Sequence, residues 1–357
     1  MRATQIDVFL SAHGWGDAVR TPVPGDASAR RYERLVLDGK KAVLMDAPSE
    51  EDGPTCPLGA SLAERKDLGY GAQAMLAGSD QAAFVCLASA LTRRGFAAPH
   101  IWGADLSAGL LLLEDLGDDL YAPVLKAEPD READLYREAV SCLSALYRSS
   151  FATSLQAHGA TWQVGTYDNM ALQVEADLFL DWYAPEFEAP LDADARADWT
   201  RIWTEAFSHL QAHATGLALR DFHAENIFAH KDRVGLIDFQ DALFAHPSYD
   251  LVSLIEDARR DVDPALAGPL ISQFCQQVGI VEDDSFHAAY AVQGAQRNAK
   301  ILGIFVRLAR RDKKPGYLDL LPRVRGHFQN DLSHPALAGL KAWVQKYAPT
   351  ALEVSDD

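Results

Sequence analysis

The sequence lacks the features that mark several classes of protein. It contains no run of 18 apolar residues, so no segment qualifies as a transmembrane helix. The first residues, Met1-Arg2-Ala3-Thr4-Gln5, hold no apolar signal core, and we therefore expect a cytoplasmic protein. The 4 cysteines lie far apart, without a CxxC pair or a Cys/His cluster, which argues against a zinc or redox site.

Positive charge is also scarce. Lys and Arg number 33 against 51 Asp and Glu, which gives a net charge of −18. Nucleic acids and anionic membranes bind basic faces, so we expect neither as a partner. The remaining composition, 48% hydrophobic and 24% charged, is ordinary for a globular enzyme. The 357 residues suffice for two lobes with buried cores, and we expect a monomer.

The N-terminal third predicts a small β-rich region. Two strand-like runs, Tyr32–Leu37 and Lys41–Met45, flank Asp38-Gly39, a dipeptide typical of a tight hairpin. The apolar run Leu110–Leu113 indicates a strand buried on both faces. Further expected elements are a helix over 5–14, a mobile loop over 47–70, a helix over 80–94 capped by Ser79 and ended by Gly95, and strands over 100–103 and 109–113.

From Asp119 onward the sequence predicts helices, apart from residues 217–240. That stretch predicts a loop followed by two strands, over 227–229 and 234–238. The expected helices cover 130–149, 168–184, 193–213, 248–260, 264–278, 283–311 and 334–347. We therefore predict an α+β protein with a β-rich nucleotide-binding lobe, 1–117, and a larger helical catalytic and substrate lobe, 118–357.

The non-helical stretch carries the most informative pattern. Asp221 is followed five positions later by Asn226, and Asp238 stands at the end of the second strand. Phosphoryl transfer of the kinase type requires one carboxylate at the attacking hydroxyl. It also requires an Asn oxygen and a second carboxylate to hold Mg²⁺ at the phosphates. The spacing therefore predicts a kinase.

The chain resembles the aminoglycoside phosphotransferase/choline kinase branch of the protein-kinase-like fold. Within that branch it is most similar to the anomeric sugar kinases of cell-wall recycling, which phosphorylate N-acetylmuramate and N-acetylglucosamine at C1. The likeness covers about residues 15–330. Its matching segments are Gly25–Ser28 with Arg31-Tyr32, Val43–Pro48, Leu111–Gly117, Arg220–His223 with Asn226, Ile237–Ala242, Pro247 with Tyr249–Leu251, and Gln296-Arg297 with Lys300–Gly303.

The resemblance implies a bilobal fold, the use of ATP and Mg²⁺, and roles for particular residues. Asp221 would be the catalytic base, and Asn226 with Asp238 would bind Mg²⁺. Arg220 and Asp250 would support the catalytic loop rather than touch the substrate. For each of these residues the alternative is a purely structural role in a loop.

The resemblance also places the nucleotide. Gly25, Asp26, Ala27 and Ser28 would form the turn over the phosphates, and adenine would meet the Glu114 carbonyl and the Leu116 N–H. One departure from the protein-kinase pattern matters, because the strand over 42–46 ends without a lysine and the following helix has no matching glutamate. A replacement cation is then needed for the phosphates. Arg30 and Arg31 are the nearest candidates, and we favour Arg31.

Four residues of the helical region are candidates for the acceptor site. Glu175 would bind a sugar hydroxyl and Trp182 would stack on a sugar face. Arg297 and Lys300 lie three apart on one helix face and would meet an acceptor carboxylate. A solvated helix surface or a core position is the alternative for each of them.

Three functions remain open from the sequence. The first is a kinase for the anomeric hydroxyl of N-acetylmuramate or N-acetylglucosamine in peptidoglycan recycling. The second is a kinase for an aminoglycoside or another small alcohol, which the acidic balance would suit. The third is a nucleotide-binding pseudokinase that regulates a partner, for which the missing lysine–glutamate pair is the only support.

Overall fold

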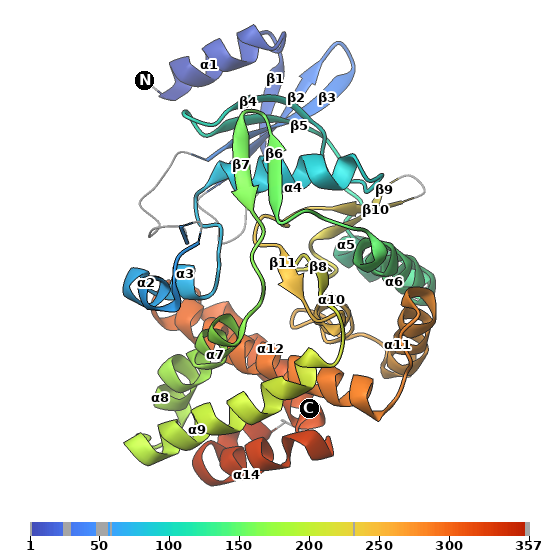
Figure 1. Ribbon diagram of the computed structural model, residues 1–357. Coiled ribbons are helices and arrows are strands. Elements are labelled where there is room, and N and C mark those ends of the chain that lie inside the picture. The colour runs from blue at the N-terminus through green and yellow to red at the C-terminus, as the bar shows by residue number, and fades with distance from the viewer. Residues whose placement is uncertain (1, 24–29, 48–55, 58, 231–232, 354–357) are drawn as a thin grey trace. The chain divides into compact units, whose positions relative to one another are not determined.

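The protein divides into two compact units, each described here by itself (Figure 1). The computed structural model describes residues 2–23, 30–47, 56–57, 59–230 and 233–353. The first, the β unit, comprises residues 1–129, 151–165 and 225–242. The second, the helical unit, comprises residues 130–150, 166–224 and 243–357. The chain passes from the helical unit to the β unit between Ala224 and Glu225, inside the segment that carries Asp221 and Asn226.

The β unit is built on an antiparallel five-stranded sheet with strand order β1-β2-β3-β5-β4. Its elements are α1 (Arg2–Ala12), β1 (Val19–Val23), β2 (Arg31–Leu37), β3 (Lys40–Asp46), α2 (Leu62–Leu68), α3 (Tyr70–Gln73), α4 (Gln81–Thr92), β4 (Ile101–Asp105), β5 (Leu110–Glu114), α5 (Tyr121–Ala127), β6 (Ser154–Ala157), β7 (Ala160–Gln163), β9 (Ile227–His230) and β10 (Arg233–Leu236).

Because side chains alternate along each strand, the two faces of this sheet have different surroundings. Leu35, Leu44 and Leu112 point to one face and are buried against Phe9 and Leu10 of α1. Residues of the opposite parity face the other way, where they line a pocket. The hairpin between β2 and β3 turns at Asp38 and Gly39, whose φ angles of 50° and 75° suit the twist of the flanking strands. The expected hairpin is therefore confirmed.

Two further hairpins join the β unit from later parts of the chain. The β6–β7 hairpin packs against α4, where the Cys86 thiol donates to the Ala160 carbonyl at 3.6 Å. The β9–β10 hairpin connects through bridges from Gly235 to Ala97 and from Phe228 to Leu120. These pairings explain why the compact units do not follow the linear division expected at residue 117.

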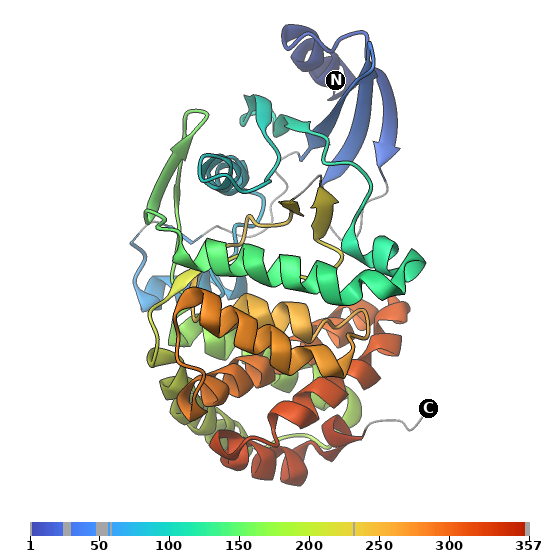
Figure 2. The ribbon, with the colours of Figure 1, turned by 90° about the vertical axis from the view of Figure 1, so that its right-hand side faces the viewer.

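The helical unit contains most of the helices and one small two-stranded sheet. Its elements are α6 (Glu132–Arg148), α7 (Asn169–Ala176), a π-helical turn (Phe179–Tyr183), α8 (Ala184–Phe187), α9 (Ala193–Ala206), a 3-10 turn (Phe207–Gln211), β8 (Gly216–Ala218), β11 (Leu243–Ala245), α10 (Ser248–Ile255), α11 (Pro264–Val278), α12 (Asp284–Arg310), α13 (Leu321–Asp331) and α14 (Ala338–Tyr347), with short 3-10 turns at Pro315–Leu320, Pro335–Leu337 and Pro349–Leu352. Figure 2 shows α6 and α11 lying side by side, and the Gln273 amide of α11 donates to the Arg137 carbonyl of α6 at 2.9 Å.

The 27-residue helix α12 forms the centre of the helical unit. A Cβ built at Gly303 would lie 2.2 Å from the Leu178 carbonyl oxygen, so only glycine permits this close approach. Beside α12, Phe179 stacks on Trp199 with ring centroids 5.3 Å apart. This aromatic packing fixes the π-helical turn against the core.

The structure changes several sequence-based expectations. The loop expected over 47–70 contains α2, which Ser61 begins with a capping box completed by Glu64. The cap of α4 is Asp80 rather than Ser79. β1, β6, β7, α5 and α13 were not expected, and the helix expected over 168–184 changes to π-helical geometry at Phe179.

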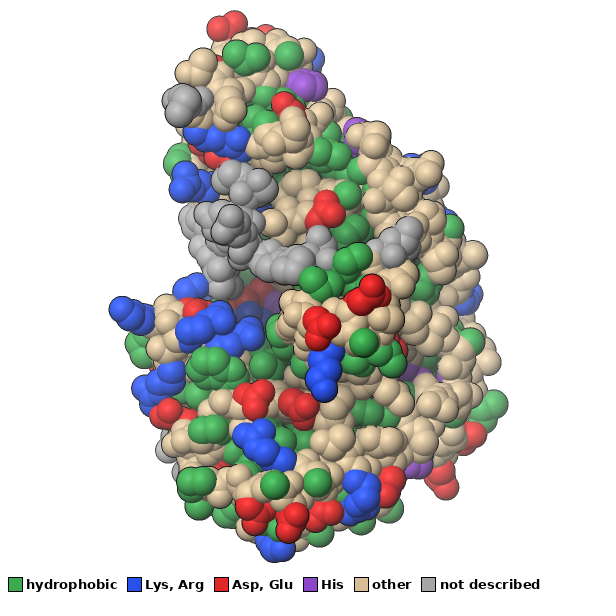
Figure 3. Space-filling view, turned by 60° about the vertical axis from the view of Figure 1, so that its left-hand side comes forward, with side chains coloured by type: hydrophobic (Ala, Val, Ile, Leu, Met, Phe, Trp, Pro, Cys, Tyr) green, Lys and Arg blue, Asp and Glu red, His purple; other side chains and the backbone are tan. Residues whose placement is uncertain are grey.

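Charge on the surface is mixed. Figure 3 shows acidic and basic side chains interspersed over the lower part of the drawn face. Exposed ion pairs such as Arg201–Glu205, at 2.9 Å on α9, accompany this mixing. No helix in the described part of the chain combines the length and apolarity needed to cross a membrane.

Candidate active site

The β unit contains a pocket of about 410 Å³ beneath its sheet. Val43 and Leu113 line it from the sheet, because their side chains point to the face opposite the one that α1 covers. Asn226 and Asp238 lie on its wall, as do Glu114 and Leu116. A pocket of this size with apolar walls and few polar groups is typical of a small-molecule or cofactor site.

The turn after β5 is held by charge and by hydrogen bonds. Arg34 reaches across from β2 to the Asp115 carboxylate at 2.7 Å, and this carboxylate also accepts the Gly117 N–H at 2.9 Å. Nδ1 of His230 lies 3.0 Å from the Leu116 carbonyl oxygen, and since a carbonyl only accepts, Nδ1 carries the proton. Within the described residues, the Leu116 N–H makes no backbone hydrogen bond outside the strand ladders.

Asn226 and Asp238 meet at the base of the β9–β10 hairpin. The Ile237 N–H donates to the Asn226 carbonyl at 3.2 Å, which draws the two ends of the hairpin together. The side-chain amide of Asn226 lies 3.4 Å from one Asp238 oxygen, and the amide of Gln240 donates to the other at 2.8 Å. Asp238 has φ 57°, a left-handed conformation that aspartate tolerates better than most residues. Strained residues of this kind concentrate at functional sites.

These two side chains suit Mg²⁺. Mg²⁺ takes oxygen ligands and is usually held by one or two carboxylates together with substrate phosphates. Asp238 and Asn226 offer such oxygens on the wall of the pocket. No group of three or more His, Cys, Asp or Glu side chains in the described residues could hold a metal by itself. The donor set therefore fits a metal that arrives with a phosphate ligand.

Of the two arginines considered from the sequence, Arg30 is the one that lines the pocket, whereas we favoured Arg31. Arg30 lines the pocket together with Tyr32 and Arg34, which have the same parity. Arg31 begins β2 on the opposite face and is exposed. The sequence showed that two neighbouring arginines alternate, but it did not show which one faces inward. Gly25, Asp26, Ala27 and Ser28 lie outside the described residues.

Helix α4 lacks the glutamate that protein kinases place beside the phosphates, and an aromatic pair packs at this side of the pocket instead. Phe84 of α4 lines the pocket and stacks on Phe239 with ring centroids 5.1 Å apart. Phe239 is fully buried and directly follows Asp238. The packing therefore anchors the Asp238 backbone to α4 without a buried ion pair.

In the helical unit, Asp221 stands in a loop that follows β8. The buried Asp250 carboxylate of α10 accepts the Leu219 N–H at 2.6 Å and the Arg220 N–H at 2.9 Å. Burial raises the pKa of Asp250 to about 7, although both N–H donors and the nearby Arg297 oppose that shift. The backbone immediately before Asp221 is thus tied to α10, and Arg220 takes a left-handed φ of 75°.

The pKa of Asp221 is lowered. Burial by itself disfavours the charged form, but four nearby basic side chains outweigh it, in the order Lys300, His223, Arg220 and Arg297. His223 contributes little charge near neutral pH, because burial lowers its pKa to about 4. Asp221 is therefore ionised at neutral pH and able to accept a proton.

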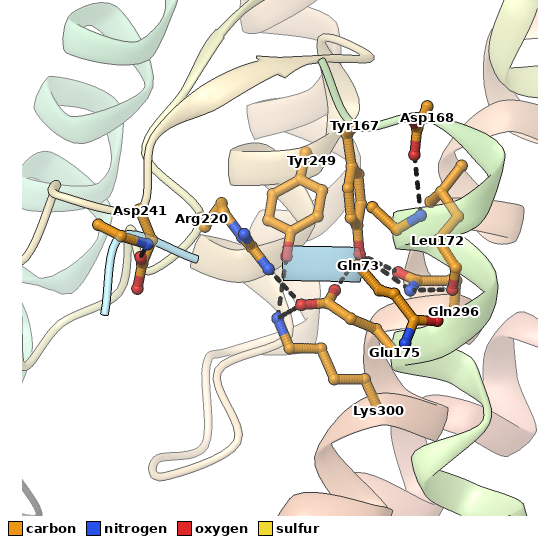
Figure 4. A network of polar contacts seen from close by, with 12 residues as sticks. Gln73, Tyr167, Asp168, Leu172, Glu175, Arg220, Asp241, Tyr249, Gln296 and Lys300 are labelled. Carbon is orange, nitrogen blue, oxygen red and sulfur yellow. Dashed lines mark hydrogen bonds and ion pairs between the residues drawn. The ribbon is translucent and has the colours of Figure 1, made fainter. Parts of the chain in front are cut away.

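Glu175 of α7 is the centre of a buried ion cluster, shown in Figure 4. Its side chain is 0% exposed, and its carboxylate pairs with Arg220 and, at 3.0 Å, with the Lys300 ammonium. The Tyr167 hydroxyl donates to the same carboxylate. This arrangement contradicts the expected contact of Glu175 with a sugar hydroxyl, because its oxygens are already bonded inside the protein.

Arg297 is a second correction. It is 4% exposed, and its guanidinium donates to Ser253 Oγ of α10 at 2.8 Å. Arg297 and Lys300 do share one side of α12, since Lys300 lies 3.5 Å from the Tyr249 hydroxyl, also on α10. Arg297 thus joins two helices, whereas the Lys300 side chain keeps 13% exposure. Trp182, in the π-helical turn, is half-buried, and its stacking role stays a prediction.

Sequence reasoning missed several polar residues of these sites. In the helical unit, Gln296 of α12 donates to the Tyr167 hydroxyl at 2.9 Å and to the Leu172 carbonyl at 3.0 Å. Gln296 lies in a matched segment and could have been found there. Tyr167 stands before α7 without any motif, so only the fold reveals it. His230 was likewise indistinguishable from any strand residue.

Residues 19–289 match the family model described as the phosphotransferase enzyme family. The chain belongs to this family. An N-acetylmuramate/N-acetylglucosamine kinase from Caulobacter vibrioides is 42% identical over 346 residues, which cover 96% of this chain and 95% of the relative. A kinase with the same name from Pseudomonas aeruginosa is 30% identical, with 92% of this chain and 89% of the relative covered.

The solved structures confirm the expected fold class for this phosphotransferase. The ADP-bound aminoglycoside phosphotransferase APH(2'')-Ib superposes with a TM-score of 0.56 at 13% sequence identity. The match covers 92% of this chain and 97% of that chain. At this identity the likeness concerns the fold alone, which is kinase-like with a β-rich and a helical part.

Proposed function

We propose that this phosphotransferase is an ATP-dependent kinase for a sugar hydroxyl, namely the anomeric hydroxyl of N-acetylmuramate or N-acetylglucosamine. The observation that carries the proposal is the shared identity of 42% with a kinase of that name along nearly the whole chain. The chemistry of the chain agrees with it, since Asp221, Asn226 and Asp238 are all present. Such a reaction belongs to the reuse of cell-wall amino sugars in the cytoplasm.

The pocket of the β unit would receive ATP. The Glu114 carbonyl and the Leu116 N–H would meet the adenine edge, and Arg30 would face the phosphates in place of the absent strand lysine. Asn226 and Asp238 would hold Mg²⁺, which supplies charge neutralisation at the phosphates when it is bound there.

Asp221 would act as the general base. Its ionised carboxylate would accept a hydrogen bond from the acceptor hydroxyl and take the proton as the phosphoryl group arrives. A hemiacetal hydroxyl is more acidic than an ordinary alcohol, so positioning and charge neutralisation supply most of the catalysis. Asp250 would keep the loop that carries Asp221 in place through its two backbone hydrogen bonds.

The test is a panel of acceptors incubated with ATP and Mg²⁺, with ADP release measured and the product examined by ³¹P NMR. We expect turnover of N-acetylmuramate and N-acetylglucosamine, with the phosphate at the anomeric carbon. Turnover of aminoglycosides or choline, without turnover of amino sugars, would replace the proposed acceptor. Nucleotide binding without turnover of any acceptor would favour the pseudokinase alternative.

A further inference from the structure

The buried ion cluster around Glu175 joins three elements of the helical unit. Glu175 comes from α7, Arg220 from the loop after β8, and Lys300 from α12 (Figure 4). The Glu175 carboxylate contacts Arg220 and the Lys300 ammonium, the latter at 3.0 Å. Arg220 directly precedes Asp221, so this carboxylate holds the neighbour of the proposed base.

The polar neighbours of the cluster hold Glu175 through further hydrogen bonds and ring contacts. Tyr167 donates to it and is itself held by Gln296 at 2.9 Å. The ring of Tyr167 packs edge-on against Tyr249, with centroids 5.2 Å apart. The Arg220 guanidinium lies 5.5 Å from the centre of the Tyr167 ring. The side chains around Glu175 are thus each engaged by packing or by a hydrogen bond, as expected of a preorganised site.

The charges of the cluster act on Asp221. One buried carboxylate faces two cations, which leaves an excess of positive charge in a poorly solvated place. Asp221 lies in the field of both cations, and Arg297 and His223 also face it. The Asp250 carboxylate faces it from α10. The excess charge is thus directed at the proposed base, and Lys300, the most exposed member at 13%, is the closest to solvent.

We propose that Glu175 and Lys300 are positioning residues for Asp221, in which Glu175 clamps Arg220 and Lys300 together and so fixes the loop that presents the base. The inference rests on the proposed function, but it assigns these residues to the loop and not to the acceptor. Loss of the clamp leaves the pocket of the β unit intact, because none of its lining residues belongs to the cluster. The effect should therefore fall on kcat and not on nucleotide binding.

The kinetic test uses Glu175→Gln, Lys300→Met, Lys300→Arg and the Glu175→Gln/Lys300→Met double variant. We expect kcat to fall about 100-fold in Glu175→Gln and about tenfold in Lys300→Met, with the KM for ATP within about threefold of the wild type. Lys300→Arg should recover most of the loss, because it keeps the cation. The double variant should be no slower than Glu175→Gln, since the two residues act as one unit.

A role in binding the acceptor gives a different pattern and would overturn the proposal. In that case Lys300→Met would raise the KM for N-acetylmuramate, which carries a carboxylate, but not that for N-acetylglucosamine, and the two single losses would multiply. The matched control is Glu205→Gln, which removes an exposed carboxylate paired with Arg201 at 2.9 Å. It should leave kcat and KM unchanged.

A second measurement does not depend on any acceptor. The Leu219 and Arg220 amides donate to Asp250 and should exchange slowly with deuterium. In Glu175→Gln we expect the peptide over residues 216–224 to exchange about tenfold faster, whereas peptides from the β unit keep their rates. Unchanged exchange at 216–224 would refute the proposed clamp even if the wild type is an active kinase. Faster exchange in a protein that phosphorylates no acceptor would support the clamp and reject only the proposed function.

Discussion

The pocket of the β unit and the ion cluster of the helical unit both contain charged side chains, yet they are organised in opposite ways. In the pocket, Asn226, Asp238 and Arg30 line about 410 Å³ of open space. In the cluster, Glu175 and Arg220 are 0% and 2% exposed and bond to each other. The pocket is a place for a ligand that brings its own charges, whereas the charged side chains of the cluster pair with one another.

This difference separates the polar residues that can bind a ligand from those that hold the protein structure together. A carboxylate with no exposed surface and three protein partners cannot accept a hydroxyl without breaking existing bonds. A carboxylate on a pocket wall can take up a metal at little cost, because its surroundings are already open. Burial and bond partners thus separate Glu175 from Asp238, although both are acids near the proposed chemistry.

The largest expected effect concerns Asp221, the residue that the helical unit presents. Asp221→Asn removes the proton acceptor but preserves the shape of the side chain. We expect turnover to fall on the order of 10²–10⁴-fold, the usual contribution of a positioned base. Calorimetry should show ATP affinity nearly unchanged. Turnover equal to that of the wild type would remove Asp221 from the mechanism.

Asp238→Ala tests the pocket of the β unit. The pocket should lose one of the two proposed Mg²⁺ ligands, and Mg²⁺–ATP affinity should fall at least about tenfold. The check is a titration of nucleotide with and without Mg²⁺. A normal dependence on Mg²⁺ would contradict the role of Asp238. Asp198→Ala, on the exposed face of α9, serves as the control and should change nothing.

Substitution of the two neighbouring arginines tests which of them contacts the phosphates. Arg30→Met should weaken ATP binding about tenfold, because a cation facing the phosphates is lost. Arg31→Met, the same change one residue later on the exposed face, should leave binding unaffected. Equal effects of the two substitutions would show that side-chain alternation does not decide the contact.

The smallest effect on activity, though a clear one on stability, is expected at α12. Gly303→Ala forces a Cβ to within 2.2 Å of the Leu178 carbonyl oxygen and should cost about 1–3 kcal/mol of unfolding free energy. Gly326→Ala in α13 meets nothing within 4 Å and should stabilise by about 0.5–1 kcal/mol. Urea unfolding measures both. Destabilisation of equal size at both glycines would show that the close approach to Leu178 is unimportant.

Much of the architecture followed from local patterns. The Asp38-Gly39 hairpin, the strand Leu110–Glu114, buried from Leu110 to Leu113, and the long helix Asp284–Arg310 each carry a strong periodic or turn signal. The β6–β7 hairpin has no such signal, and its place in the β unit comes from packing on α4, far away in sequence. Boundaries failed where a single cap or a change to π-helical geometry decided them.

The candidate site divides in the same way. Spacing alone singled out Asp221, Asn226 and Asp238, because the chemistry requires these residue types close together in the chain. The partners of Glu175 could not be deduced, because two of them, Arg220 and Lys300, come from distant segments and Tyr167 carries no motif. The choice between Arg30 and Arg31 depends on strand parity, which no single sequence states.

The hydrogen bond from His230 to the Leu116 carbonyl bears on which purine the turn accepts. With that carbonyl engaged, the contacts proposed for the purine are one backbone donor at Leu116 and one backbone acceptor at Glu114. Adenine presents one exocyclic donor beside a ring acceptor, whereas guanine presents a carbonyl beside a ring N–H and so reverses the order. If the turn receives the purine as proposed, His230 would favour ATP over GTP, and a relative gain in GTP affinity in His230→Phe would measure that preference.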